Sequence, residues 1–292
     1  MKLNIIIVNY RSWERLDKCL SGIYRQQFSD YTITVVDNFS NDGMTDEFCK
    51  LHSKVQFILQ DFNGGFAQAC NRGAKSSDSS YLLFLNPDTF FSDEILQPLL
   101  DTFDVHHDWK IVGIHQRNES GRNMHPFGIF LKCWNVWAPV RSLERMFGGK
   151  KHSKIHLSTA PVSFPDWISG SFVLIRRSDF EELGGWDERF WMYCEDMDLS
   201  KRAAEKNWKR VMYNDLSIIH SHGGSSRINH DIKAKTKLEV IRSKRFYINK
   251  HFSGIRQKIA LFTLLFTTYM ELLLLWPFSA TKRKMLQLSF TQ

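Results

Sequence analysis

The sequence lacks the short motifs that mark the commonest nucleotide-binding and hydrolytic sites. VNYRSWERL follows the first expected strand and contains neither the GxGxxG turn of a dinucleotide site nor a GxxxxGK[ST] loop. GxSxG and HExxH are also missing from the chain. These absences argue against a Rossmann dinucleotide site, a P-loop, a serine hydrolase elbow and a zinc protease helix.

Cysteine is sparse and shows no pairing pattern. No CxxC pair occurs among the five cysteines, which are Cys19, Cys49, Cys70, Cys133 and Cys194. The spacing therefore predicts neither a zinc site nor a disulfide framework, and reduced thiols fit it best. The opening MKLNIIIVNY has too short an apolar run for a signal peptide, so a cytosolic protein is expected.

The positive charge is concentrated at one end of the chain. Hydrophobic residues make up 43% and charged residues 24% of the 292 residues, which is an ordinary globular composition. Residues 227–292 hold thirteen Lys and Arg against three acids, which exceeds the net charge of +8 of the whole chain. The body of the protein is therefore nearly neutral, and this disfavours nucleic-acid binding.

The first 90 residues alternate between apolar runs and amphipathic stretches. Buried strands are expected at 3–8, 31–36, 55–59 and 81–85, and helices at 12–24, 45–52 and 66–75. This alternation predicts an α/β fold with a mostly parallel sheet flanked by helices. Four polar residues fall just after expected strand ends, where ligands bind in such sheets: Asn9, Asp37, Asn63 and Asp88.

The pattern is less regular after residue 90. Ser92 is expected to cap a helix over 92–103, residues 116–165 to form loops and hairpins, and 166–176 to form one strand. Further helices are expected at 178–183, from residue 195 onward and at 229–252, with extended chain at 211–213 and 218–220.

Asp37 and the turn Asn63-Gly64-Gly65-Phe66 are the first candidate ligand sites. The Asp37 carboxylate is suited to accept a hydrogen bond from the imide of a pyrimidine base, and an Asx turn or helix cap is the alternative. The glycine turn leads into a helix that contains Asn71. The free N–H groups of such a helix start suit phosphate or sugar oxygens, and an ordinary loop-to-helix glycine pair is the alternative.

Asp88, in Asn86-Pro87-Asp88, is a candidate metal ligand, and so is His220. A carboxylate just past a buried strand needs a partner, and a divalent cation that bridges to a diphosphate would supply one. His220 stands before a glycine pair and two serines in IIHSHGGSS, and either phosphate or metal contact or a structural role fits it.

Three carboxylates (Glu195, Asp196 and Asp198) follow the apolar residues WMYC. One acid at a helix start is good capping, but three acids behind an aromatic stretch exceed what capping requires. A carboxylate that stays ionised could accept the proton of an attacking sugar hydroxyl. The pattern therefore predicts a general base at the start of this helix, with neighbouring acids in support.

These motifs together resemble those of inverting family 2 glycosyltransferases with a GT-A fold. The resemblance covers roughly residues 3–226 and consists of VNY at 8–10, VVDN-S at 35–40, N-GGFA---N-G at 63–73, NPD at 86–88, DW-SGSF-LIRR at 166–177, GGWDERFWMYCEDMDL at 184–199 and H-HGGSS at 220–226. Within the family the chain is most similar to the dTDP-rhamnose-dependent rhamnosyltransferases of O-antigen, capsule and cell-wall assembly.

The resemblance implies a role for each motif. Asp196 would be the general base with Glu195 beside it, and Asp88 with His220 would hold Mg²⁺ or Mn²⁺ on the donor diphosphate. The implied nucleotide-sugar-binding residues are Val8, Asn9, Tyr10, Asp37, Asn63, Gly65, Phe66, Asn71, Asn86, Asp88, Trp167, Gly170 and Ser225. Many relatives carry DxD where this chain has Asn86-Pro87-Asp88, which implies a more loosely held metal.

Residues 259–278 form an apolar stretch long enough to span a bilayer, but Glu271 near its middle argues against a lipid-facing span. With the basic residues before it, the stretch predicts a peripheral or monotopic protein on an anionic membrane surface, the cytoplasmic face of the inner membrane. The alternative is a buried core helix. Residues 1–226 would then be the GT-A domain and 227–292 its membrane-associating extension.

The expected reaction is transfer of L-rhamnose from dTDP-rhamnose to a saccharide on a polyprenyl diphosphate, with inversion at the anomeric carbon. The alternatives are galactofuranosyl or other hexosyl transfer on the same fold, or a non-catalytic scaffold that only binds nucleotide sugars. The intact acidic cluster disfavours the scaffold.

Overall fold

The computed structural model describes residues 1–292 except 138, 141–142, 145–159, 222–228 and 291–292. The chain divides into two compact units. The first consists of Met1–Ile129, Ile155–Trp191 and Glu195–His222. The second consists of Phe130–Lys154, Met192–Cys194 and Gly223–Gln292, so it takes two segments from inside the range expected for the first domain.

The first unit contains strands β1 to β11 and the helices between them. Its strands are β1 (Leu3–Asn9), β2 (Tyr31–Asp37), β3 (Gln56–Leu59), β4 (Tyr81–Leu85), β5 (Thr89–Phe90), β6 (Trp109–Arg117), β7 (Phe127–Gly128), β8 (Val162–Ser163), β9 (Trp167–Ile168), β10 (Phe172–Arg176) and β11 (Lys209–His220). Its helices are α1 (Trp13–Tyr24), α2 (Thr45–Leu51), α3 (Gly65–Ala74), α4 (Leu96–Val105), α7 (Arg177–Glu182) and α8 (Glu195–Glu205). This confirms the predicted α/β class.

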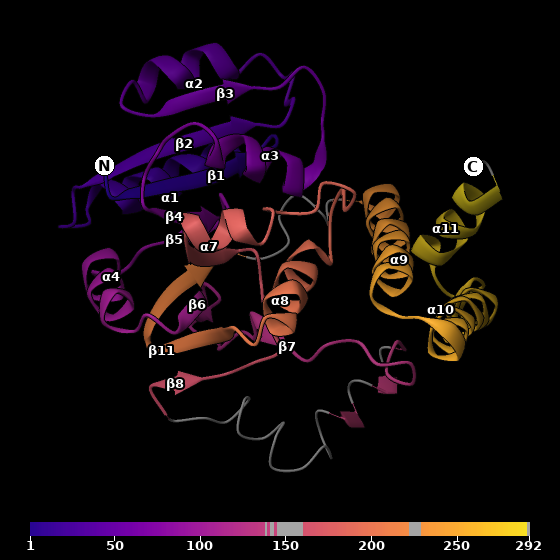
Figure 1. Cartoon of the computed structure of the whole chain (residues 1–292). Helices are drawn as coiled ribbons and strands as arrows, with labels where there is room; N and C mark the ends of the chain where they lie inside the picture. Colours follow the sequence, from indigo (N-terminus) through magenta and orange to yellow (C-terminus); the bar gives the residue numbers. More distant parts are fainter. Residues whose placement is uncertain (138, 141–142, 145–159, 222–228, 291–292) are drawn as a thin grey trace. The chain divides into compact units, whose positions relative to one another are not determined.

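The strands form a nine-stranded sheet within the described residues, in the order β3-β2-β1-β4-β10-β6-β11-β5, with β8 on β11. β3, β2, β1 and β4 are parallel to one another, and β10 runs antiparallel between β4 and β6. Figure 1 shows the helices arranged around this sheet. The parallel strands therefore end at one edge, where β1, β2 and β4 deliver Asn9, Asp37 and Asn86.

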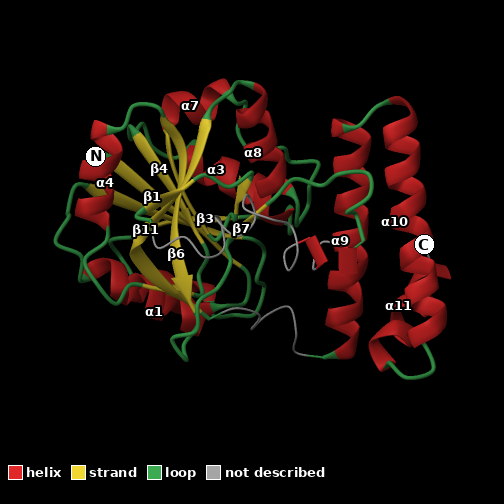
Figure 2. Cartoon of the chain, turned by 90° about the horizontal axis from the view of Figure 1, so that it is seen from below, coloured by secondary structure: helices red, strands yellow, loops and turns green. Residues whose placement is uncertain are grey.

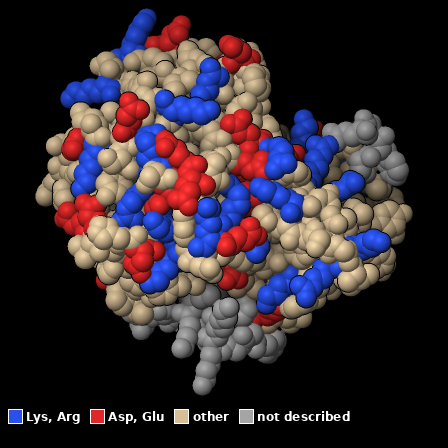
Figure 3. Space-filling model, in the orientation of Figure 1, with Lys and Arg blue, Asp and Glu red and all other residues tan. Residues whose placement is uncertain are grey.

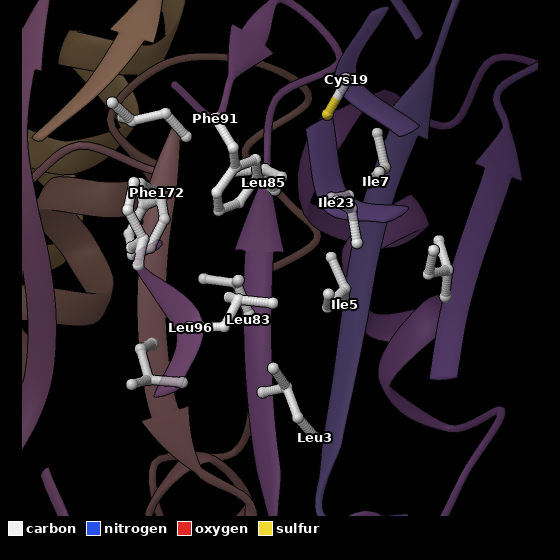
Figure 4. Packing of buried hydrophobic residues seen from close by; sticks show 14 of the residues in the cluster. Leu3, Ile5, Ile7, Cys19, Ile23, Leu83, Leu85, Phe91, Leu96 and Phe172 are labelled. Atoms are coloured by element: carbon white, nitrogen blue, oxygen red, sulfur yellow. The ribbon is translucent and has the colours of Figure 1, made fainter. Parts of the chain in front are cut away.

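The sheet is covered by apolar side chains on both faces. All seven residues of β1 are buried, as a strand covered by helices on each side requires. Figure 4 shows the packing of Leu3, Ile5 and Ile7 of β1 with Leu83 and Leu85 of β4 and with Ile23 of α1. The other face carries a second cluster built around Ile6, Phe84 and Trp186. Each face buries several large side chains, at about 1.5–3 kcal/mol for each one.

Three local expectations were wrong. The stretch 166–176 is broken at Ser169–Ser171 into β9 and β10, because β9 pairs with β7 while β10 joins the large sheet. Ser92 does not cap a helix: α4 begins at Leu96, and its first N–H groups donate to the Gln26 side chain instead. Residues 109–117 form the central strand β6, which extends into the range expected to be loops.

The second unit contains three helices within the described residues: α9 (His230–His251), α10 (Gly254–Leu275) and α11 (Ala280–Phe290). Asn229 caps α9, because its side chain accepts a hydrogen bond from the Ile232 N–H at 2.9 Å. Figure 2 shows α9 and α10 side by side along most of their length. Two apolar clusters hold them together, one with Ile248 and Leu264 and the other with Ala234 and Leu272.

Candidate active site

The loops after β1 and β2 are tied together at the edge of the sheet. The Asn9 side chain donates to Asp37 Oδ1 at 2.9 Å, and the Ser40 N–H donates to Asp37 Oδ2 at 3.0 Å. Ser40 Oγ donates to Asp37 Oδ1 at 2.5 Å and accepts from the Arg11 N–H at 2.8 Å. Asp37 is 4% exposed, and its carboxylate bonds the backbone of its own loop at Ser40. Contact of Asp37 with a nucleotide base stays a prediction.

Asn38 holds the glycine turn in place, a role that sequence reasoning did not assign to it. Its Oδ1 accepts from Gln60 Nε2 at 2.8 Å and from the Gly64 N–H at 3.0 Å. Its Nδ2 donates to Asn63 Oδ1 at 3.0 Å and to the Gly65 carbonyl at 3.2 Å. Every hydrogen-bonding position of this buried amide is therefore occupied, which fixes the turn against the end of β2.

The glycine turn also contacts the residue that leads toward α8. Gly65 has φ +85°, and a Cβ there would lie 2.0 Å from the Trp191 carbonyl oxygen, so only glycine fits. The Phe66 N–H donates to that same oxygen at 2.9 Å. The Trp191 indole donates to the Asn63 carbonyl at 3.1 Å. The turn and Trp191 therefore form one rigid piece of the site.

The Asn71 amide bonds to the segment around Trp186. Its Nδ2 donates to the Trp186 carbonyl and to Glu188 Oε1, both at 2.8 Å, and its Oδ1 accepts from the Trp186 N–H at 2.9 Å. These bonds hold the loop that precedes the acidic helix, and contact of Asn71 with the nucleotide sugar stays a prediction.

Asp88 and His220 meet at the ends of neighbouring segments. Asp88 Oδ1 lies 3.2 Å from His220 Nε2, and the Ser221 N–H donates to the Asp88 carbonyl at 2.9 Å. His220 Nδ1 lies 2.8 Å from Gln116 Oε1, and Gln116 Nε2 donates to Ser171 Oγ at 2.8 Å. Because the Gln116 side-chain oxygen can only accept a hydrogen bond, His220 Nδ1 carries a proton and donates to it. The other ring nitrogen of His220, Nε2, faces the Asp88 carboxylate.

This pair fits a divalent cation. A carboxylate oxygen and an imidazole nitrogen are both ligands for Mn²⁺, and Mg²⁺ prefers the oxygen. Among the described residues, no group of three or more His, Cys, Asp or Glu could hold a metal ion. Two protein ligands leave room for phosphate oxygens, which agrees with the looser site expected from Asn86 in place of a first aspartate.

The acidic cluster forms the first turn of α8. Asp198 is fully buried and pairs with Arg202 at 2.8 Å. Burial and the neighbouring carboxylates raise the pKa of Glu195 well above its ordinary value, and its Oε2 has no hydrogen-bond partner among the described residues. Desolvation raises the pKa of Asp196 to about 6, opposed by hydrogen bonds from the N–H groups of Met197 and Gly170.

The turn before β10 connects the acids to the Asp88–His220 pair. The Gly170 N–H lies 3.3 Å from Asp196 Oδ2. The next residue, Ser171, accepts from the Asn86 N–H at 3.1 Å and bonds to Gln116, which contacts His220. A chain of contacts through this turn therefore links Asp196 to the Asp88–His220 pair.

Comparisons with known proteins identify the family. The profile described as Glycosyl transferase family 2 matches residues 4–184, and that described as Glycosyl transferase family group 2 matches residues 130–290. The chain belongs to glycosyl transferase family 2. Of the implied nucleotide-sugar-binding residues, all except Ser225 lie inside the first match.

Two relatives of this family 2 glycosyltransferase are rhamnosyltransferases. The N-acetylglucosaminyl-diphospho-decaprenol L-rhamnosyltransferase of Mycobacterium tuberculosis is 23% identical over 253 residues, which cover 77% of each chain. Rhamnosyltransferase WbbL of Escherichia coli K12 is 24% identical over 265 residues, which cover 86% of this chain and 97% of WbbL. The chain is therefore rhamnosyltransferase-like.

A solved structure confirms the fold. The mannosyltransferase PcManGT from Pyrobaculum calidifontis, in complex with GDP-Man and Mn²⁺, superposes with a TM-score of 0.57 at 13% identity. The match covers 99% of this chain and 79% of that one. The predicted GT-A architecture is therefore present in this glycosyltransferase.

The remaining predicted residues differ in how they are placed. Val8 is buried in β1, whereas Tyr10 is 41% exposed just after it. Trp167 donates its indole N–H to the Ile129 carbonyl at 3.0 Å, inside the small β7–β9 sheet, which favours a structural role. Ser225 lies outside the described residues. Asn86 contributes its backbone N–H to the turn before β10.

Proposed function

We propose that this glycosyltransferase moves L-rhamnose from dTDP-rhamnose to a hydroxyl group of a lipid-linked saccharide, with inversion of the anomeric carbon. The observation that supports the proposal is the chain of contacts through Gly170, Ser171 and Gln116 that links Asp196 to the Asp88–His220 pair. The two rhamnosyltransferase relatives support the donor sugar, and the printed name of the mycobacterial one supports a polyprenyl-linked acceptor.

Asp196 is proposed as the general base. Its partly exposed carboxylate is ionised at neutral pH, since its pKa of about 6 lies below that pH, and so it can take a proton. The acceptor oxygen then bonds to the anomeric carbon as the bond from that carbon to the diphosphate oxygen breaks. Burial and the neighbouring carboxylates also raise the pKa of Glu195, which favours its protonated form and reduces the negative charge beside the base.

Asp88 and His220 are proposed to hold Mg²⁺ or Mn²⁺. When bound, such a cation stabilises the negative charge of the leaving nucleoside diphosphate. Asp37 and the backbone at 8–10 are proposed to face the nucleotide base, and the N-terminus of α3 after Gly65 to face the donor oxygens. Asn38 and Asn71 position these loops through the contacts described above.

A panel of nucleotide sugars tests the donor. Thermal unfolding is measured with dTDP-rhamnose, UDP-glucose, UDP-galactofuranose and UDP-N-acetylglucosamine, each with and without Mn²⁺. Stabilisation by dTDP-rhamnose that requires Mn²⁺ is expected, because a donor that binds only the folded state raises its free energy of unfolding. If one of the UDP-sugars stabilises the protein and dTDP-rhamnose does not, that UDP-sugar would be the donor instead of dTDP-rhamnose.

The pH dependence tests the base. The transfer rate is expected to rise with pH and to level off above a midpoint near pH 6, because the protonated Asp196 carboxyl cannot accept a proton. Initial rates at saturating donor between about pH 4.5 and about pH 8 measure this profile. A rate independent of pH through this range would contradict the assignment of Asp196.

Measuring sugar transfer distinguishes the two alternatives, another hexosyltransferase and a non-catalytic scaffold. Another hexosyltransferase would show transfer with a different donor in the same assay. A non-catalytic scaffold would bind a nucleotide sugar, yet release no nucleoside diphosphate with any lipid-linked acceptor. The two adjacent acids with raised pKa values favour an enzyme, since a binding module gains nothing from them.

A further inference from the structure

α10 carries an exposed apolar stripe along its whole length. The stripe consists of Ile255, Ile259, Phe262, Phe266, Tyr269, Leu273 and Trp276, whose side chains are between 43% and 69% exposed. Their spacing alternates between four and three residues, so they lie on one face of the helix. Among the described residues, α10 is also the one helix long and apolar enough to cross a membrane.

The opposite face of α10 is occupied by its own unit. Ala260 and Leu264 pack with Ile248 near the end of α9, and Leu272 packs with Ala234 near its start. The two helices are therefore antiparallel neighbours, as Figure 2 also shows. One side of α10 therefore packs against α9 and the other side is exposed, and each side runs along the whole helix.

α9 is charged along the length over which it accompanies α10. It carries seven Lys and Arg residues, namely Lys233, Lys235, Lys237, Arg242, Lys244, Arg245 and Lys250. α10 could cross a bilayer only by separating from α9 or by drawing these charges into the hydrocarbon, which costs several kcal/mol for each charge. Glu271 of α10 adds a further charge, paired with Lys282 of α11 at 2.5 Å. These contacts exclude a spanning orientation for the packed unit.

Positive charge also borders the stripe. Arg256 and Lys258 lie near the start of α10, and Arg283 of α11 donates to the carbonyls of Trp276 and Pro277 at its end. In Figure 3, blue Lys and Arg side chains surround a broad uncharged area over the C-terminal helices. An apolar face with a cationic border matches the boundary between acyl chains and anionic headgroups.

We propose that α10 lies in the plane of an anionic bilayer surface, with its apolar stripe in one leaflet and α9 on the protein side. This placement refines the membrane partner expected from the sequence, since it selects an in-plane helix over a span. It does not depend on sugar transfer, because vesicle binding is measured without donor or acceptor.

Binding is tested by flotation of the full-length protein with phosphatidylcholine vesicles that contain or lack phosphatidylglycerol. Binding is expected with phosphatidylglycerol, and Phe262→Glu with Phe266→Glu is expected to weaken it at least about 100-fold, since two aromatic side chains lose their apolar environment. The control is Leu51→Glu with Val105→Glu, which alters two side chains 70% and 75% exposed in the first unit. Equal binding by both double variants would overturn the proposal.

The orientation of α10 is tested by measuring how deep three of its positions lie in the bilayer. An environment-sensitive fluorescent amino acid is placed at Ile259, Phe266 or Leu273, and quenching is compared for lipids brominated at shallow and at deep acyl positions. An in-plane helix predicts the same shallow depth at all three positions. A maximum depth at Phe266 would indicate a span and overturn the proposal.

A second copy of the chain could also cover the stripe, because its spacing suits a coiled-coil seam. The molar mass in solution is therefore measured without vesicles. A monomer that binds vesicles supports the proposal. A dimer that the Phe262→Glu and Phe266→Glu substitutions convert to a monomer would assign the stripe to self-association instead.

Discussion

Asp196→Asn is expected to lower the rate of sugar transfer by about 100- to 10,000-fold, because asparagine cannot accept the proton of the acceptor hydroxyl. The amide retains an oxygen that can accept the Gly170 N–H, so the local structure is expected to persist. Initial rates at about pH 8, well above the midpoint, measure the loss. Asp78→Asn, at an exposed position, is the matched control and should transfer sugar normally.

The same substitution is expected to stabilise the fold at alkaline pH. The pKa of Asp196 rises from 3.8 to about 6 in the folded protein, so the folded state binds a proton more tightly than the unfolded chain. The free energy of unfolding therefore falls as the pH rises from about 4 to 6 and stays lower above it. Removing the charge should recover about 1–3 kcal/mol at about pH 8 and almost nothing near pH 4.

Urea unfolding at both pH values checks this result. A variant that is inactive and also less stable at the higher pH would mean that the substitution disturbs the first turn of α8. The loss of activity would then say nothing about a base. If the Asp196→Asn variant is fully active, Asp196 is not the general base, whether or not the stability of the variant changes.

Asp88→Ala is expected to lower transfer at least about 100-fold and to abolish the thermal stabilisation by Mn²⁺ with a nucleoside diphosphate. The reason is the loss of the carboxylate ligand that faces His220 Nε2 at 3.2 Å. The melting temperature without ligands should change little, because Asp88 is partly exposed and its backbone carbonyl keeps its bond from Ser221.

Asp93→Ala provides the control for this variant, since it removes an exposed acid five positions along the chain. It should keep both the activity and the response to Mn²⁺. His220→Ala should weaken the Mn²⁺ response more than a response to Mg²⁺, because imidazole suits manganese better than magnesium. An undiminished Mn²⁺ response in Asp88→Ala would place the cation elsewhere.

The strands that the sequence predicted well share one property. β1, β2 and β4 are short runs of apolar residues buried on both faces, so their pattern depends on little beyond the helices that cover them. β6 was missed because WKIVGIHQR mixes charged and small residues with apolar ones. Packing requires glycine at position 113 of this strand, because a Cβ there would lie 2.5 Å from the Ile168 side chain.

The candidate site divides in a similar way. Its acids could be proposed from the sequence because three carboxylates behind an apolar stretch exceed what helix capping requires. Their partners could not, because contacts such as His220 with Gln116 join distant segments and leave no periodic signal. Asn38 lay inside a recognised motif, yet its function follows only from the four hydrogen bonds that the fold assembles.

The close approach of Gly65 to the Trp191 carbonyl has a consequence for how such enzymes can be recombined. The glycine turn packs so closely against Trp191, before the acidic helix, that no additional carbon atom fits between them. A chimera that imports either segment alone from a relative would join two surfaces shaped separately. The two segments would therefore have to be exchanged together to keep this contact.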